Sequence, residues 1–408
     1  MSLASAAVSP SIEATSPRSF PAGPLLVAAA IGWAAWALHG AFGWRMGALF
    51  LVGTGAGVVL YHAAFGFTSA WRVFIADGRG EGLRAQMLLL ALTSGVFFPL
   101  LAQGQAFGTT LNGSVQPVGV PVVIGAFMFG IGMQLGGGCA SGTLFSVGGG
   151  STRMIVTLAA FIAGSVLATA HTAFWATLPS FPATSLVKLY GPVAALAISL
   201  AAFGAIFIAT VIVERRRFGR LMPVELPSRG ARWLRGPWPL TAGAVGLMLV
   251  NVATLLLAGR PWGITSAFAL WGAKIGRGLG VSIESWPYWS TPSQLAALNG
   301  SVFRDVASVM DGGIVVGALL AALLAGRFKP QWSVPLRSLA AAVIGGLLLG
   351  YGARVAYGCN IGAYFSGISS GSLHGWLWLP AAFAGNTIGT YLRPTFGLGV
   401  ERTALPKC

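Results

Sequence analysis

Two cysteines in the sequence stand among glycines and small polar residues, each after a long apolar segment. The first motif consists of Gly138, Cys139, Ser141, Gly142 and Thr143, and the second consists of Gly358, Cys359, Asn360 and Gly362. A neutral thiol donates a weak S–H hydrogen bond, and a buried thiol away from cations stays protonated at neutral pH. A protonated thiol is therefore a neutral donor, which would not repel an anion as a thiolate would. We expect the anion to pass between the cysteines without a covalent step.

Both motifs interrupt apolar sequence, which is typical of a broken or re-entrant helix. Non-helical backbone at membrane depth occurs where it is buried in protein or lines a cavity, and the N–H groups at a half-helix N-terminus attract anions. Two other interpretations remain open. The glycines would also permit close helix packing, with the cysteines as small apolar fillers. In the second interpretation, the two cysteines form the dithiol of a membrane redox protein, although no CxxC, haem or flavin motif accompanies them.

Three landmarks occur in the same order in each half of the sequence, which predicts an internal repeat. They are Thr68-Ser69-Ala70 with Thr265-Ser266-Ala267, the pentapeptide Leu-Asn-Gly-Ser-Val at 111–115 and 298–302, and the two cysteine motifs. Repeats of this kind in transporters place the substrate between the halves, near the middle of the membrane. The threonines and serines of the first landmark therefore join the cysteine motifs as candidate substrate-binding residues: Thr68, Ser69, Thr265 and Ser266.

The composition is that of a membrane protein. Charged residues make up 8% of the 408 residues and hydrophobic residues 55%, whereas a soluble domain has roughly 25% charged residues. Since a spanning helix needs about 20 apolar residues, the sequence predicts ten full spans and one short segment, 264–281. The full spans are expected near 24–42, 46–66, 86–103, 119–137, 154–175, 190–213, 239–258, 311–326, 338–356 and 376–393.

Positive charge is concentrated between the apolar segments, so the net charge of +16 indicates membrane topology and not nucleic-acid binding. The positive-inside rule places the N-terminus and the arginine-rich loop in the cytoplasm. The halves are then predicted to be inverted, because two spans precede Thr68 but only one separates the basic loop from Thr265. The expected domains are a disordered tail at 1–22, a first repeat at 23–213, the basic loop at 214–238, a second repeat at 239–395 and a C-terminal tail at 396–408.

Few ionisable residues lie in or beside the apolar segments, and each is a candidate for function. Arg354 precedes Cys359 by five residues and would supply positive charge to an arriving anion. Lys274 and Arg277 are further candidates. All three side chains would alternatively extend to the membrane interface. Two aspartates near a span boundary are expected to be solvated, Asp305 and Asp311.

The cysteine motifs resemble those of the YeeE/YedE family of sulfur-compound transporters. The resemblance rests on GIGMQLGGGCASGT, on GYGARVAYGCNIGAYFSGISSGSLHGW and on Gly-Phe-Thr-Ser-Ala at 66–70, and it covers about residues 45–395. It implies an all-α polytopic membrane protein of two pseudo-symmetric halves, with Cys139 and Cys359 lining a central route. Members are associated with thiosulfate uptake, and some with selenium metabolism. Some have a further cysteine near the first broken segment, where this chain has Thr68 and Ser69, so that a hydroxyl would replace a thiol or the substrate would differ.

The function expected from these observations is transport of a small sulfur-containing anion, in the first place thiosulfate, across a bacterial inner membrane. The alternatives are transport of a selenium compound or polysulfide, or a membrane dithiol redox protein. The sequence has no Walker motif, and we expect neither enzymatic activity nor a cofactor. A small cytoplasmic sulfur-carrier protein is a candidate partner that would dock on the basic loop 214–238, whose simpler role is to set the topology.

Overall fold

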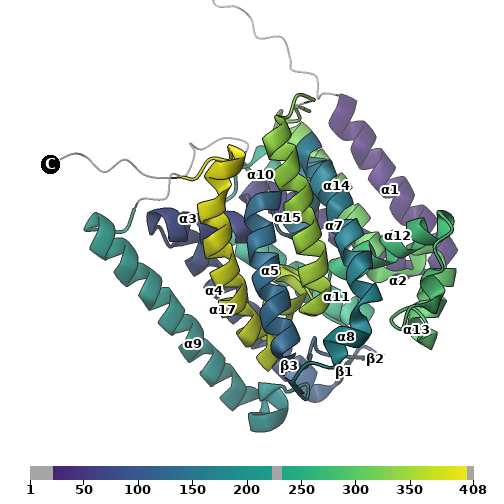
Figure 1. Ribbon diagram of the computed structural model, residues 1–408, viewed down its shortest axis with the longest axis horizontal. Helices are drawn as coiled ribbons and strands as arrows, with labels where there is room; N and C mark the ends of the chain where they lie inside the picture. Colours follow the sequence, from purple (N-terminus) through teal and green to yellow (C-terminus); the bar gives the residue numbers. More distant parts are fainter. Residues whose placement is uncertain (1–21, 223–231, 331, 402–408) are drawn as a thin grey trace, which may run out of the picture.

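A computed structural model describes residues 22–222, 232–330 and 332–401 of the chain. These residues form a bundle of helices, drawn in Figure 1. The long helices are α1 (Ala22–Phe42), α2 (Trp44–Ala63), α4 (Glu81–Gln103), α5 (Val120–Gly136), α7 (Thr152–Ala170), α9 (Leu186–Phe218), α11 (Leu240–Ala258), α14 (Val306–Leu324), α15 (Leu336–Val355) and α17 (Leu373–Leu392).

Short elements connect the long helices. The short helices are α3 (Phe67–Asp77), α6 (Ala140–Gly148), α8 (Thr172–Ala176), α10 (Arg232–Arg235), α12 (Thr265–Gly278), α13 (Pro292–Asn299), α16 (Ser366–Ser369), η1 (Ile283–Ser285), η2 (Val302–Arg304), η3 (Asn360–Phe365) and η4 (Arg393–Phe396). Two pairs of antiparallel two-residue strands complete the described part, β1 (Gln105–Ala106) with β2 (Thr109–Thr110) and β3 (Val118–Gly119) with β4 (Ser180–Phe181).

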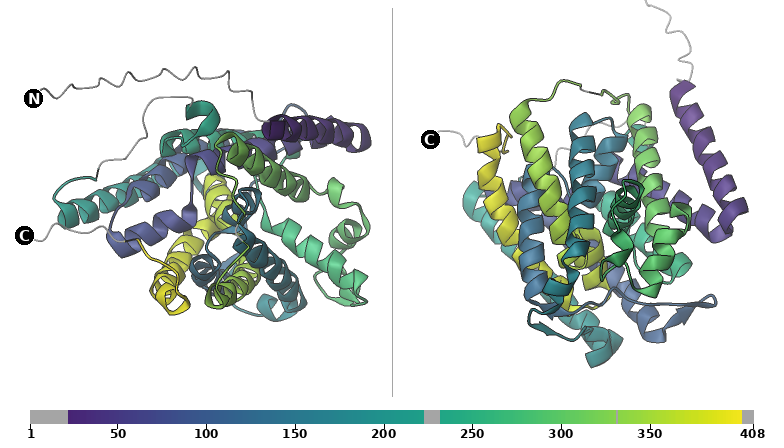
Figure 2. Two further views of the ribbon diagram at one scale, coloured as in Figure 1. Left: turned by 90° about the horizontal axis from the view of Figure 1, so that it is seen from above. Right: turned by 45° about the vertical axis from the view of Figure 1, so that its right-hand side comes forward.

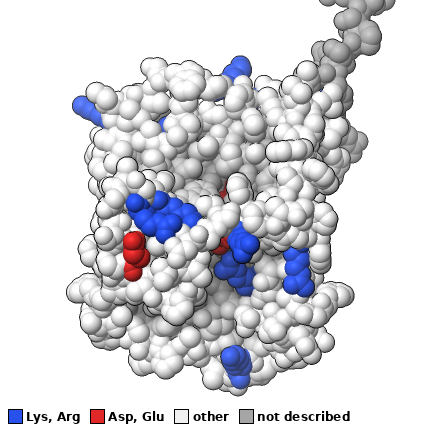
Figure 3. Space-filling view, turned by 90° about the vertical axis from the view of Figure 1, so that its right-hand side faces the viewer, with Lys and Arg blue, Asp and Glu red and all other residues white. Residues whose placement is uncertain are grey.

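The long helices carry the membrane character of the sequence. Within the described residues, nine helical stretches are both long and apolar enough to cross a bilayer, which confirms an all-α polytopic membrane protein. Each of the ten predicted full spans coincides with a long helix. Nine of these helices belong to the nine apolar stretches, and the tenth, α17, does not. On the face drawn in Figure 3, charged side chains are sparse and most of the surface is uncharged, as expected of helices that meet lipid.

Two long helices lie at the outside of the bundle. α1 and α9 stand on opposite sides of the molecule in Figures 1 and 2. Only 6% and 17% of their apolar windows are buried, against 61% for α14. α9 also bends at Gly191, where the backbone leaves the helical conformation just before Pro192. These two helices therefore add apolar outer surface, and the remaining long helices form the core that positions the cysteines.

Glycines bring the backbones of the central helices into direct contact. A methyl group at Gly345 of α15 would lie 2.1 Å from the backbone nitrogen of Gly136 in α5. One at Gly350 would lie 2.1 Å from a backbone oxygen of α7, and one at Gly317 of α14 would lie 2.0 Å from a backbone oxygen of α2. Small residues permit such close approach in membranes, where van der Waals contact drives helix association.

Helix contacts in one half of the chain have counterparts in the other half. α7 packs on α15 as α17 packs on α5, and α2 packs on α14 as α11 packs on α4. The contact of α14 with α6 likewise corresponds to that of α4 with α16. This correspondence pairs α5 with α15 and α2 with α11, and the internal repeat itself stays a prediction.

Helices matched in this way run in opposite directions where they touch each other. The neighbours of Gly125 and Gly132 in α5 are Gly352 and Gly345 in α15, so α5 and α15 are antiparallel. The contacts of α11 with α2 follow the same antiparallel order. The pentapeptide landmark departs from the correspondence, because it follows α4 in the first half but precedes α14 in the second.

The structure changes three local expectations. α1 begins at Ala22, inside the predicted tail 1–22, whose other residues lie outside the described part. The basic loop 214–238 begins as helix, because α9 continues to Phe218, and its centre is not among the described residues. Asp311 is not solvated but completely buried, because α14 already begins at Val306. The other domain limits stay predictions.

Candidate functional site

The first cysteine motif ends one helix and begins another. α5 ends at Gly136, the chain turns through Gly137 with a φ of 92°, and Cys139 is the N-terminal cap of α6. The Cys139 carbonyl accepts hydrogen bonds from the backbone N–H and the hydroxyl of Thr143, both 2.8 Å. The Cys139 Sγ lies 3.3 Å from the Ser141 Oγ, and the side chain is buried. The thiol is thus fixed at the start of a half-helix inside the protein.

The second motif has the same local geometry. Cys359 caps η3, and its extended backbone (φ −99°, ψ −167°) matches that of Cys139 (φ −81°, ψ −169°). The Ala363 N–H donates to the Cys359 carbonyl at 2.8 Å, as Thr143 does in the first motif. The chain enters through Gly358 at a φ of 154°, where a methyl group would lie 2.7 Å from the Ala363 nitrogen. η3 is a π-helix, a rare form that is frequent at functional sites.

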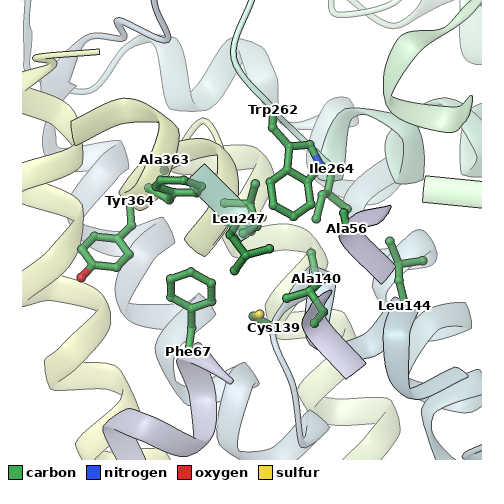
Figure 4. Packing of buried hydrophobic residues seen from close by; sticks show 14 of the residues in the cluster. Ala56, Phe67, Cys139, Ala140, Leu144, Leu247, Trp262, Ile264, Ala363 and Tyr364 are labelled. Atoms are coloured by element: carbon green, nitrogen blue, oxygen red, sulfur yellow. The ribbon is translucent and has the colours of Figure 1, made fainter. Parts of the chain in front are cut away.

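The half-helices that begin at the two cysteines touch each other. α6 contacts η3, and both cysteines belong to one cluster of buried apolar residues. Figure 4 shows Cys139 in this cluster beside Phe67 and Ala140, with Tyr364 of η3 nearby. The fold therefore brings together two motifs that lie far apart in the sequence.

Buried polar groups without hydrogen-bond partners lie in this region. Asn360 follows Cys359 and is fully buried, yet neither atom of its side-chain amide has a partner within the described residues. The buried Thr68 hydroxyl at the start of α3 is also unpartnered there. Leaving such a group unsatisfied costs roughly 1–3 kcal/mol, which favours a ligand that supplies the missing bond. Beside Gly362 there is room for one, since a methyl group would meet nothing within 4 Å.

The two Thr-Ser-Ala landmarks differ in their surroundings. The Thr68 carbonyl accepts a hydrogen bond from the Gln134 side chain near the end of α5. Ser69 lines a pocket of about 200 Å³, together with Arg79, Glu81 and Gln86. In the second landmark, Thr265 is buried at the start of α12, whereas Ser266 is exposed. The structure therefore does not bring Ser266 into the buried region around the cysteines.

Arg354 lies beside the second motif but not at its thiol. It donates a hydrogen bond to the Tyr288 hydroxyl at 3.1 Å, and its guanidinium lies 5.2 Å from the centre of the same ring. Both residues line a pocket of about 150 Å³ with Tyr357, two residues before Cys359. Arg354 thus lies at a pocket next to the second motif, and its contact with an anion stays a prediction.

Lys274 and Arg277 form hydrogen bonds to the second Leu-Asn-Gly-Ser-Val segment, residues 298–302. The Lys274 ammonium donates to the carbonyls of Leu298 and Gly300, both 2.7 Å away, and Arg277 donates to the Asn299 side chain. Burial and the neighbouring Arg277 lower the pKa of Lys274. These contacts give the two basic side chains a local role at the pentapeptide.

Three arginines surround the C-terminal end of α5, next to the first cysteine motif. Arg153 donates to the carbonyls of Leu135 and Gly136 at 2.6 and 2.7 Å, and Arg393 donates to the Gln134 carbonyl at 2.7 Å. Cations suit these unpaired carbonyls and the negative end of the helix dipole. The third arginine, Arg72, binds the Gln134 side chain and the carboxylate of Glu401.

Sequence reasoning did not find this arginine cluster (Arg72, Arg153 and Arg393). Burial and the charge of Arg72 lower the pKa of Arg393 to about 10, so the Arg393 guanidinium remains cationic at neutral pH. No spacing in the sequence links the three residues. The cluster depends on the way the ends of α5, α7 and α17 meet, which is a tertiary feature.

The fold defines a multi-spanning membrane protein in which two buried cysteines cap half-helices. The chain belongs to the sulphur transport family, whose model matches residues 62–388. It is 30% identical over 339 residues to the thiosulfate transporter TsuA of Spirochaeta thermophila, which is 80% of this chain and 92% of that protein. It is 24% identical over 340 residues to TsuA of Escherichia coli K12, 79% of this chain and 87% of that protein. A match to the probable transporter YedE of E. coli K12, 30% identical over 171 residues, covers 41% of this chain and only 42% of YedE.

Proposed function

We propose that the protein carries thiosulfate, or a closely related sulfur anion, across the membrane along a route lined by Cys139 and Cys359. The observation that carries this proposal is the pair of buried thiols that cap touching half-helices. Asn360, whose side-chain amide has no partner within the described residues, is the residue that follows Cys359. The similarity to two thiosulfate transporters supports the choice of substrate.

The site would hold an anion through hydrogen-bond donors and not through the positive charge of a basic side chain. The N-termini of α6 and η3 carry partial positive charge, and protonated thiols and the Asn360 amide add neutral donors. Such contacts suit transport, because a site on a conducting route must bind favourably and still release its ligand. A sulfur-rich anion also matches the soft sulfur atoms of the two cysteines.

The route would connect two pockets at opposite ends of α5. The pocket lined by Ser69 adjoins the C-terminal end of α5, because Gln134 there contacts Thr68. The pocket lined by Arg354 includes Pro121 from the N-terminal end of α5. Positive charge is present at both ends, from the arginine cluster at the first and from Arg354 at the second. An anion would therefore meet attraction at each mouth and weak donors between them.

The orientation in the membrane is part of the proposal. We place the N-terminus and the basic loop 214–238 in the cytoplasm of a bacterial cell, with the two halves inverted within its inner membrane. The antiparallel contacts of α5 with α15 and of α2 with α11 support the inversion. A cytoplasmic sulfur-carrier protein would then receive the anion on the side of the basic loop.

Uptake of radiolabelled thiosulfate into proteoliposomes tests the proposal. The variants are Cys139→Ala and Cys359→Ala, and Cys408→Ala is the matched control, because it makes the same change at the last residue of the chain. We expect uptake by the wild type and by the control, and little or none by the two variants. Size-exclusion profiles and melting temperatures establish that all four proteins are folded.

Three outcomes would contradict the proposal. Folded wild-type protein that takes up no thiosulfate would exclude this substrate, and competition with selenium compounds and polysulfide would then identify the cargo. Full uptake by either cysteine variant would exclude a route that depends on both thiols. Oxidation of the wild-type thiols coupled to an electron acceptor, without uptake, would indicate a membrane redox protein.

A further inference from the structure

Asp311 is a completely buried carboxyl group inside α14. Neither of its oxygens has a hydrogen-bond partner within the described residues. Helical periodicity places Asp311 on one face of α14 with Val315 and Ala318, and atoms of these two residues adjoin Gly148 at the end of α6. The carboxyl group therefore lies on the side of α14 that faces the half-helix beginning at Cys139.

Two titratable groups interact electrostatically with Asp311, the carboxyl of Asp305 and the thiol of Cys359. Asp305 is partly exposed and caps α14, where it accepts hydrogen bonds from the backbone N–H and the hydroxyl of Ser308 at 2.8 and 2.7 Å. Its other carboxylate oxygen lies 3.8 Å from a guanidinium nitrogen of Arg260. Asp305, Ser308 and Asp311 follow one another at intervals of one helical turn, from the partly exposed end of α14 to its buried interior.

Of the elements that pack on α14, the half-helix α6 carries no titratable side chain, and the other elements do. None of these titratable side chains forms a hydrogen bond to Asp311. They are His39 on α1, Arg45, Tyr61 and His62 on α2, Lys274 and Arg277 on α12, Arg304 on η2 and Arg235 on α10. Within the described residues, Asp311 thus has no cation to neutralise it directly.

The charge state of Asp311 matters for an anion at the cysteines. A buried carboxylate without donors is strongly unfavourable, and its protonated form avoids this cost. A dianion arriving near Cys359 would add repulsion to an ionised Asp311. The two negative charges are therefore incompatible in one small, poorly solvated region, and proton binding at Asp311 would remove the conflict. Carboxyl groups within membrane helices commonly act in this way.

We propose that Asp311 binds a proton together with the transported sulfur anion, which makes the protein a proton-coupled symporter. This inference rests on the proposed function. A carboxylate oxygen of Asp311 takes up the proton on the side from which the anion enters. The proton leaves with the anion on the other side, when Asp311 is open to water and its ionised form is tolerated. One thiosulfate of charge −2 and one proton then cross together, with a net charge of −1.

Two transport assays on the same proteoliposomes test the coupling. The first measures exchange of labelled for unlabelled thiosulfate at equal pH on both sides. The second measures accumulation when the outside is one pH unit more acidic, with the membrane potential held at zero by potassium and valinomycin. For one proton per anion, one pH unit corresponds to about tenfold accumulation. We expect wild-type protein to exchange and to accumulate.

The decisive variant is Asp311→Asn, which has the shape of the protonated residue but cannot release a proton. It should keep exchange and lose the accumulation driven by the pH gradient. Glu284→Gln makes the matching change at an exposed carboxyl and should keep both activities. A pH-sensitive dye inside the vesicles gives a reading independent of any variant, because thiosulfate added outside should acidify the lumen of wild-type vesicles.

The outcomes separate this inference from the proposed function. Wild-type protein that exchanges thiosulfate but neither accumulates it along a pH gradient nor acidifies the lumen would overturn proton coupling alone. Accumulation by Asp311→Asn equal to that of the wild type would overturn the role of Asp311. Wild-type protein without any exchange would instead contradict the proposed function. If Asp311→Asn fails to fold, Asp311→Glu, which retains a carboxyl group, should restore both folding and accumulation.

Discussion

Asn360 combines complete burial, an unpartnered side-chain amide and a position next to Cys359. A buried amide normally finds partners, and its isolation within the described residues is why we propose that it contacts the substrate. The amide nitrogen can donate to an anion, and its short side chain leaves no freedom to turn toward solvent. Among the residues named from the sequence, Asn360 is therefore the one whose structural surroundings most favour substrate contact.

Replacing Asn360 by alanine is expected to weaken thiosulfate binding. A hydrogen bond to a charged group contributes roughly 1.5–3 kcal/mol, so the concentration for half-maximal uptake should rise about tenfold or more. The concentration dependence of uptake into proteoliposomes measures this change. Asn112→Ala, which alters an exposed asparagine, is the control. An unchanged half-maximal concentration in Asn360→Ala would remove Asn360 from the site.

The pairing of Arg72 with Glu401 should depend on pH. Hydrogen bonds from Arg72 hold the pKa of the Glu401 carboxyl below its ordinary value. A carboxyl with a lowered pKa stabilises the folded state above its unfolded pKa, and this contribution disappears as the pH falls through the folded-state value. We therefore expect the contact to persist at neutral pH and to be lost only on acidification to below the ordinary pKa of a glutamate.

Hydrogen–deuterium exchange of the peptide 393–401, compared with the same peptide unfolded at each pH, measures this loss. Protection should fall only on acidification in the wild-type protein. Glu401→Gln should have the low protection already at neutral pH and should not change further on acidification. Equal protection of variant and wild type at neutral pH would contradict a stabilising role for the ion pair.

At the scale of elements, hydropathy predicted the ten long helices because each needs a long apolar run. It could not resolve α3, α6 and η3, which have 11, 9 and 6 residues, because segments of this length depend on tertiary contacts. The start of α14 was also misplaced. The Asp305 side chain caps that helix ahead of its apolar run. Asp311 therefore lies inside α14 and not at its exposed end.

The same limit applies to the site. Both cysteine motifs were found because glycine and polar residues interrupt apolar sequence, a local pattern. The unpartnered amide of Asn360 and the arginine cluster could not be predicted from local sequence patterns, because they arise from contacts between helices that are distant in the sequence. Ser266 was included only because its landmark repeats, and its exposure follows from the way α12 packs.

Close packing of α15 on α5 predicts sensitivity to one methyl group. Gly345→Ala should lower the melting temperature in detergent by several degrees, because overpacking a tight contact costs roughly 1–3 kcal/mol. Thermal unfolding followed by intrinsic fluorescence measures the shift. Gly95→Ala, on an α4 position with open space around it, should leave the temperature unchanged or raise it slightly. Equal melting temperatures for Gly345→Ala and wild type would show that the contact can relax freely.

At the scale of the whole molecule, the proposed topology makes a prediction about the two faces. Alkaline phosphatase fused after Gly108, in the turn between β1 and β2, should be active because it lies outside the cytoplasm. Green fluorescent protein fused after Phe218, at the end of α9, should fluoresce because it stays inside. The opposite pattern at both sites would reverse the orientation, and the same side for both would contradict the number of spans between them.

The glycine contacts of α15 with α5 and α7, and of α14 with α2, have a consequence for movement. Helices whose backbones touch cannot slide or rotate past one another without separating along their whole length, because tightly packed interiors do not deform continuously. A large rocking motion of one half against the other would therefore break many contacts at once. The half-helix α6 is held in the same way, because Gly148 at its end lies against the backbone of α14. Gating would then be confined to a few residues within a rigid frame. Two small gates that open in turn, and not a hinge between the halves, would let the anion and the proton cross together.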